Sequence, residues 1–103
     1  MASSKQEFFN NLNNDPHMLA AIEAVKQVVN AGSVQELQLA EYELNGAINS
    51  ALSGSTPRQC LTTISSTIAN WIGTLRLKSQ GDSLLEQRIS VLSKSFNYLD
   101  NSY

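Results

Sequence analysis

The chain has 103 residues, of which 42% are hydrophobic and only 16% are charged, and its formal net charge is −2. This length suits one domain spanning residues 1–103, and 14 Ser, 10 Asn and 7 Gln replace much of the charge found in a usual soluble domain. The composition excludes a strongly basic nucleic-acid coat, an acidic disordered tail and a disulfide-stapled miniprotein, since Cys60 is the only cysteine.

Apolar residues recur at helical spacing along almost the whole chain. A short first helix is expected over about residues 4–13. Asp15 and Pro16 then start a second helix, because an Asp side chain caps free N–H groups and proline fits the first turn. Gly32 is expected to end this helix in the left-handed conformation. The apolar stripe of the second helix is Met18, Ile22, Val25 and Val29.

Ser33 and Glu36 have the spacing of a capping box at the start of a third helix. In this motif the serine hydroxyl accepts from the N–H of Glu36, and the glutamate carboxylate reaches back to the N–H of Ser33. The third helix is expected to run to about residue 52. Its apolar stripe is Leu37, Ala40, Leu44, Ala47 or Ile48, and Ala51.

Two more helices follow. Thr56 and Pro57 repeat the arrangement of a cap followed by a proline, Gly81 is expected to stop the fourth helix, and Asp82 caps the fifth. The stripes are Leu61, Ile64, Ile68, Trp71 and Leu75 in the fourth helix, and Leu85, Ile89, Val91 or Leu92, Phe96 and Leu99 in the fifth.

These near-heptad stripes, joined by short capped turns, predict an all-α fold: an antiparallel four-helix bundle with a short extra N-terminal helix. No segment alternates with period two, so strands are not expected. No run of about 18 apolar residues predicts a membrane span. The N-terminal residues lack the apolar core of a signal peptide, and an unpaired Cys60 suits a reducing compartment, so a cytoplasmic location is expected.

The fourth helix is unusual because no charged residue lies between Arg58 and Arg76. A helix that exposes one face to water normally carries Lys and Glu on that face. Ser and Thr stand there instead, although they are poorer helix formers. Their hydroxyls can bond to the carbonyl one turn earlier, so they tolerate burial better than ions do.

Three interpretations of this uncharged stretch stay open. It is the central helix of the monomer, with Trp71 in the monomer's own core, or it is covered by a second subunit, or it is covered by a target protein. Interface cores are poor in charge and rich in aromatic anchors. The last two interpretations predict an interface that contains Thr63, Ser66, Asn70, Trp71 and Thr74.

The two halves of the chain carry opposite net charges. Residues 1–53 hold two lysines against six acidic residues, for a net −4, and residues 54–103 hold five basic against three acidic residues, for a net +2. Opposite halves could steer the pairing of helical hairpins within a chain or between chains. The alternative is that these charges only keep the surface solvated.

No catalytic, cofactor or metal site is expected. A zinc or di-iron site needs several ligands at suitable spacing, and the chain has one His and one Cys. His17 and Cys60 each lie near a predicted helix start, but the sequence offers no third group to orient such a pair and no glycine-rich oxyanion loop. Phosphate-binding glycine motifs are also absent from the sequence. We favour a buried structural role for Cys60.

The sequence therefore predicts a small non-catalytic helical protein that acts by protein–protein binding. It would serve as an adaptor, an inhibitor or immunity protein, or an assembly chaperone, and would form a homodimer through the fourth helix. The alternative is a structural subunit of a larger assembly, such as a virion or a secretion machine. A second alternative is nucleic-acid binding through Arg76, Lys78, Arg88 and Lys94, although the chain is acidic overall.

Overall fold

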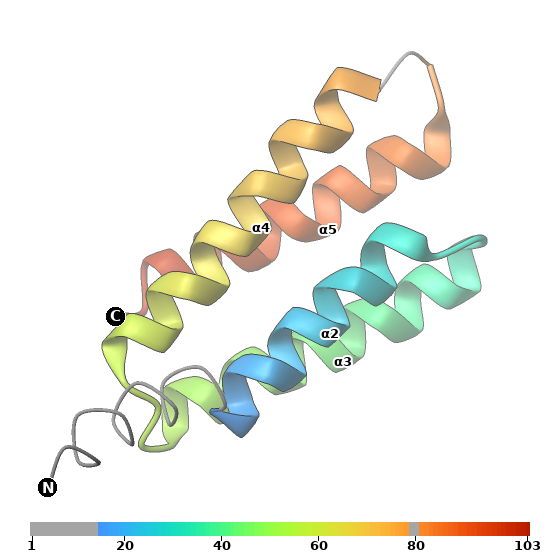
Figure 1. Cartoon of the computed structure of the whole chain (residues 1–103). Coiled ribbons are helices and arrows are strands. Elements are labelled where there is room, and N and C mark those ends of the chain that lie inside the picture. Colours follow the sequence, from blue (N-terminus) through green and yellow to red (C-terminus); the bar gives the residue numbers. More distant parts are fainter. Residues whose placement is uncertain (1–14, 79–80) are drawn as a thin grey trace, which may run out of the picture.

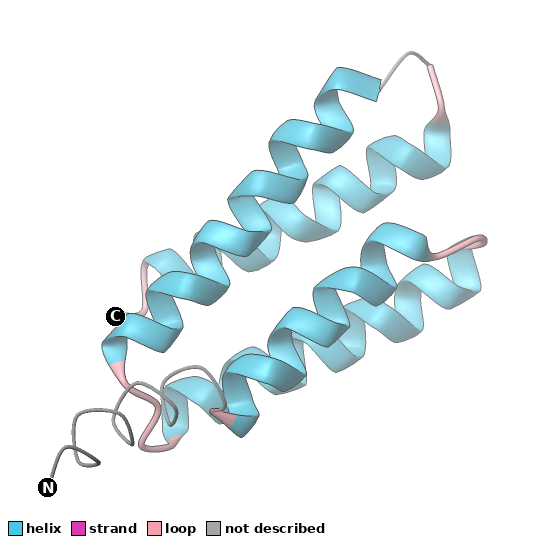
Figure 2. Cartoon of the chain, viewed as in Figure 1, coloured by secondary structure: helices cyan, strands magenta, loops and turns pink. Residues whose placement is uncertain are grey.

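The structure is a computed structural model that describes residues 15–78 and 81–103. Those ranges contain four helices and no strand (Figure 2), which confirms the all-α prediction. The expected short helix over residues 4–13 lies outside the described residues. The four helices are α2 (Pro16–Asn30), α3 (Val34–Ser53), α4 (Arg58–Lys78) and α5 (Ser83–Asp100).

The helices are arranged as two pairs that lie side by side (Figure 1). α2 packs mainly on α3, and α4 packs mainly on α5. The pairs join through contacts of α2 with α4 and of α3 with α5. α3 and α4 follow each other in sequence, yet they lie diagonally across the bundle, with α4 in front and α3 behind α2 in Figure 1. Their outer faces therefore point away from each other.

Three of the predicted helix starts have the expected caps. The Asp15 carboxylate accepts from the Met18 N–H at 2.9 Å, the Ser33 hydroxyl accepts from the Glu36 N–H at 3.1 Å, and the Asp82 carboxylate accepts from the Leu85 N–H at 3.1 Å. Each cap satisfies one of the N–H groups that a helix start leaves without an internal partner. These contacts explain why α2, α3 and α5 begin where the sequence predicts.

Two details around Gly32 differ from the prediction. Gly81 is the only described residue with a positive φ, at 81°, so the expected left-handed Gly32 is wrong. α2 instead ends at Ala31 in an extended conformation, and the Arg88 side chain donates to the Ala31 carbonyl. The Glu36 carboxylate accepts from the Gly32 N–H at 2.7 Å and not from the N–H of Ser33. The extended turn brings the Gly32 N–H, rather than that of Ser33, toward this carboxylate.

Thr56 does not cap α4, so that prediction is also wrong. The Thr56 Oγ1 atom is buried without a hydrogen-bond partner. The Pro57 carbonyl accepts from the N–H groups of Cys60 and Leu61 at 2.9 and 3.2 Å, so the helical turn closes on Pro57. Thr56 therefore lies one residue too early in the chain to act as the cap.

One continuous core lies between the four helices, and every helix contributes fully buried side chains to it. On α2 and α4 the buried side is rotated slightly about the helix axis relative to the predicted apolar stripe. On α2, Ile22 and Val29 are only half-buried while Ala21 and Val28 are buried. The largest fully buried side chains are those of Val25, Val28, Leu44, Ile48, Cys60, Ile64, Ile68, Leu92 and Leu99.

Candidate protein-binding face

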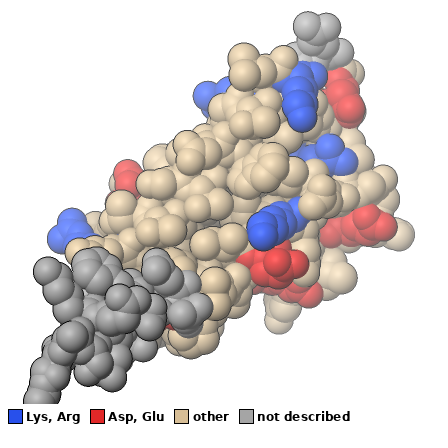
Figure 3. All heavy atoms as spheres, viewed as in Figure 1, with Lys and Arg blue, Asp and Glu red and all other residues tan. Residues whose placement is uncertain are grey.

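The outward side of α4 is exposed along its whole length and carries no charge between Arg58 and Arg76. We call this surface the α4 face, and it consists of Gln59, Thr63, Ser66, Asn70, Gly73, Thr74 and Leu77. In Figure 3 the surface over α4 is mostly uncharged, and Lys and Arg atoms lie toward its two ends. No described part of the chain covers the α4 face.

The structure brings the five predicted interface residues together on and beside this face. Thr63, Ser66, Asn70 and Thr74 are exposed, whereas Trp71 is half-buried and packs against the core. The outer part of Trp71 lines a shallow hollow with Thr67, Asn70 and Thr74. Trp71 thus contacts the monomer's own core and also borders the exposed surface.

Three of the four threonines of α4 use their hydroxyls within the helix, as the sequence predicts. The hydroxyls of Thr63, Thr67 and Thr74 donate to the carbonyls of the residues four positions earlier, at 2.9, 2.8 and 3.0 Å. A hydroxyl that already has a partner loses less when water is removed from it. What these side chains still offer to a partner is mainly their methyl groups.

Gly73 has no structural reason inside the monomer to be glycine. A Cβ atom at this position would meet nothing within 4 Å, and its φ is not positive. Glycine within a helix costs roughly 0.5–1 kcal/mol relative to alanine. The missing side chain leaves the α4 backbone open to close approach by another molecule.

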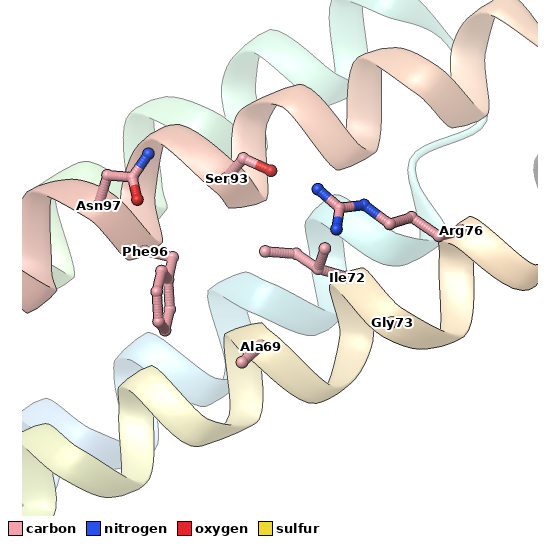
Figure 4. A pocket seen from close by; sticks show the side chains of 7 residues that line it. All are labelled: Ala69, Ile72, Gly73, Arg76, Ser93, Phe96 and Asn97. Carbon is pink, nitrogen blue, oxygen red and sulfur yellow. The ribbon is translucent and has the colours of Figure 1, made fainter.

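A groove of about 350 Å³ runs beside the α4 face, between α4 and α5. Figure 4 shows Ile72 and Phe96 reaching toward it from the two helices, and the Arg76 guanidinium extending toward Ser93. Arg76 forms no ion pair with any described residue. The groove therefore has apolar side chains from both helices and the Arg76 cation at its rim.

The four basic residues considered for nucleic-acid binding do not form one patch. Arg76 lines the groove between α4 and α5, and Lys94 lies with Glu41 in a hollow between α3 and α5. The Arg88 side chain is directed between helices, where its Nε donates to the Ala31 carbonyl at 3.1 Å and its Nη2 donates to the same oxygen. Lys78 is exposed near the end of α4.

The described residues hold no group of three or more His, Cys, Asp or Glu that could bind a metal ion. Cys60 is buried in the core, in agreement with the structural role that we favour for it. Burial raises the pKa of the Cys60 thiol, and the nearby Asp15 carboxylate raises this pKa further. The neutral thiol is therefore favoured over the nucleophilic thiolate.

Sequence reasoning missed a second exposed surface, on the outer side of α3. We call it the α3 face, and it consists of Gln35, Leu39, Tyr42, Gly46 and, at its edge, Asn49, whose side chain accepts a hydrogen bond from the Tyr98 hydroxyl of α5. Leu39 is 61% exposed and Tyr42 is 78% exposed. These residues share the side of the helix opposite the predicted stripe of Leu37, Ala40 and Leu44. The presence of Leu and Tyr on that side is the sequence signal that could have revealed this face.

The C-terminal tyrosine lies against α4. The hydroxyls of Tyr103 and Ser65 are 3.0 Å apart, and the Arg58 guanidinium lies 5.7 Å from the centre of the Tyr103 ring. These contacts give the buried Ser65 hydroxyl a partner and hold the end of the described chain next to the start of α4.

None of the described helices has the length and apolar character needed to cross a lipid bilayer. Comparison of the chain with protein-family models, with curated proteins and with solved structures finds no match.

Proposed function

We propose that this is a small non-catalytic helical protein that acts by protein–protein binding through the α4 face, with a second copy of the chain as its partner in a homodimer. The observation that carries the proposal is the exposure of a full helix face that lacks charge over the 17 positions between Arg58 and Arg76. Adaptors, inhibitor or immunity proteins and assembly chaperones are the kinds of protein that use such a surface.

Desolvation supports a protein partner for this face. Burying an unpaired charge is very costly, whereas the α4 face offers the methyl groups and hydrogen-bonded hydroxyls of Thr63 and Thr74, and its remaining polar side chains are uncharged. Removal of apolar surface from water contributes roughly 25 cal/mol per Å². Burying the α4 face therefore costs less desolvation free energy than burying a helix face that carries Lys and Glu.

We also propose that the described helices form an antiparallel bundle. The connection between α2 and α3 and the one between α3 and α4 are three and four residues long. Such connections span about 10–14 Å, while a helix of 20 residues is about 30 Å long. Consecutive helices joined in this way fit best when they run in opposite directions. A reduced Cys60 would suit a cytoplasmic location.

Sedimentation equilibrium of the purified chain over a series of concentrations tests the proposed function. We expect self-association, and we expect Asn70→Glu to abolish it because this change places an unpaired charge in the middle of the α4 face. Ala20→Glu, at an exposed position on α2, is the matched control and should associate like the wild type. A wild-type chain that stays monomeric at every concentration would refute the proposal.

One observation also favours the alternative of a structural subunit in a larger assembly. The bundle exposes a second uncovered surface, the α3 face, on the side opposite to the α4 face. A subunit with two binding surfaces on opposite sides can contact two neighbours at once.

A further inference from the structure

α3 and α4 carry opposite charges that cannot neutralise each other within one chain. α3 contains three glutamates and no basic residue, while α4 contains two arginines and one lysine and no acidic residue. The two helices lie diagonally across the bundle, so their outer faces point away from each other. On α3, Glu43 is exposed and has no hydrogen bond or ion pair with a described residue.

Both faces also contain a glycine that the monomer does not need. Gly46 lies in the middle of the α3 face and Gly73 lies in the α4 face. A Cβ atom at either position would meet nothing within 4 Å, and neither glycine has a positive φ. Small residues at matching sites on two helices let the backbones approach each other closely.

Exposed apolar side chains lie beside each glycine. On the α3 face these are Leu39 and Tyr42, and on the α4 face the exposed apolar side chain is Leu77, which is 86% exposed. Aromatic residues such as Tyr42 are favoured anchors of protein interfaces. The two faces thus share an exposed glycine with apolar neighbours, and they differ in the sign of their flanking charges.

We propose that the α4 face of one copy of the chain docks on the α3 face of a second copy, so that copies associate head to tail. This inference rests on the proposed self-association through the α4 face and names the surface that this face binds, with head-to-tail association in place of the closed homodimer. If the two helices run antiparallel with Gly46 opposite Gly73, Glu43 would lie close to Arg76 of the neighbouring copy. A contact between two α4 faces would instead bring cations together in either orientation, because basic residues lie at both ends of α4.

Head-to-tail docking leaves one free face of each kind on every open complex. Such heterologous contacts build open chains, or rings if the rotation between copies closes. One helix face of this length measures about 31 Å by 10 Å, which is small for a specific interface, so association should be weak and should grow with concentration.

Two variants that each block one face provide the test. Asn70→Glu places a negative charge on the α4 face, and Tyr42→Arg removes the anchor of the α3 face and adds a positive charge. Each variant alone should be monomeric, because head-to-tail association needs both faces. A mixture of the two should form a 1:1 complex that grows no further, since one intact α4 face then meets one intact α3 face.

Sedimentation velocity at matched concentrations measures these species, and circular dichroism checks that each variant is folded. Ala20→Glu and Ala20→Arg, at an exposed site on α2, introduce the same charges outside both faces and should associate like the wild type. If Tyr42→Arg alone still forms a dimer and the mixture yields nothing new, the α3 face is not the partner and this inference is overturned.

Ionic strength provides an independent test, because added salt should change the strength of association in opposite directions for head-to-tail docking and for contact between two α4 faces. Docking of the α3 face, which glutamates flank, on the α4 face, which basic residues flank, should weaken as added salt screens the attraction, while contact between two α4 faces should strengthen because salt screens the repulsion between their basic ends. A closed dimer that salt stabilises would overturn head-to-tail docking and leave the proposed function standing. A monomer under all conditions would refute the proposed function as well.

Discussion

At the scale of single residues, Arg88 shows how a charged side chain becomes structural. It is half-buried on α5, and its guanidinium donates from two nitrogens to the carbonyl of Ala31, at the end of α2. This carbonyl belongs to the part of a helix end that lacks internal hydrogen bonds. Arg88 thus compensates for the absence of a left-handed glycine turn and links the two helical pairs.

We expect Arg88→Met to lower the free energy of unfolding by about 1.5–3 kcal/mol, because it removes charge-assisted hydrogen bonds and leaves the Ala31 carbonyl without its donor. Urea denaturation followed by circular dichroism measures this change. Lys94→Met is the matched control at an exposed position on the same helix and should cost far less. Equal losses in the two variants would show that the contact with Ala31 contributes no stability.

Because the Cys60 thiol is buried, we expect the stability of the fold to depend on pH in the alkaline range. Burial raises the pKa of the folded thiol above the ordinary value of 9.0. Stability linked to this group is therefore fully present below pH 9.0 and falls as the pH rises from there through the folded pKa, because the unfolded chain releases the proton more readily.

The melting temperature of the wild type should thus decrease more steeply above this pH than that of Cys60→Ala. The difference between the two profiles isolates the thiol from tyrosines and lysines that titrate in the same range. Parallel profiles would show that the folded thiol titrates at its ordinary pKa.

At the scale of helices, Thr56 and Asp82 are both predicted from the sequence to cap a helix, but the structure shows a different role for each. Asp82 caps α5, whereas the Thr56 hydroxyl is buried with no partner. We expect Asp82→Ala to cost about 0.5–2 kcal/mol of stability.

Thr56→Val should instead stabilise the fold by about 1–3 kcal/mol, because it replaces an unsatisfied hydroxyl with a methyl group of similar size. Thermal unfolding of both variants measures these shifts, and a loss of stability in Thr56→Val would indicate that the hydroxyl has a partner.

The two open glycines give a second prediction at this scale. Gly46→Ala and Gly73→Ala should each raise the free energy of unfolding by about 0.5–1 kcal/mol, because alanine restricts the unfolded chain and meets no neighbour in the folded one. Gly81→Ala is the contrasting control and should destabilise, since Gly81 has a φ of 81°. If Gly46→Ala and Gly73→Ala lower stability in dilute solution, the monomer itself requires glycine at these positions.

At the scale of the whole molecule, the sequence was sufficient to predict the helices and most of their buried sides. Apolar spacing and the caps at Asp15, Ser33 and Asp82 are local signals, so they need no knowledge of the neighbouring helices. The end of α2 could not be predicted in the same way, because its carbonyl is satisfied by Arg88, 57 positions further along the chain.

The arrangement of the helices explains what the sequence could not reveal about the site. The lack of charge on α4 is visible in sequence, but whether the chain covers that face depends on which helices are neighbours. The diagonal placement of α3 and α4 leaves both outer faces uncovered by the described chain. The apolar stripe predicted for α4 includes Trp71, yet the slight rotation of this helix buries Ile72 and leaves Trp71 at the boundary of the core.

The separation of acidic and basic helices to opposite corners gives the molecule an electric polarity that its small net charge of −2 conceals. Near neutral pH and in dilute buffer, the protein should be retained by anion-exchange and by cation-exchange resins alike. The acidic α3 side should bind the anion exchanger, and the basic α4 side should bind the cation exchanger. Tyr42→Arg combined with Glu43→Gln should lose retention on the anion exchanger while keeping it on the other resin. In a cell, the same polarity would orient the molecule on approach to any charged surface before contact is made.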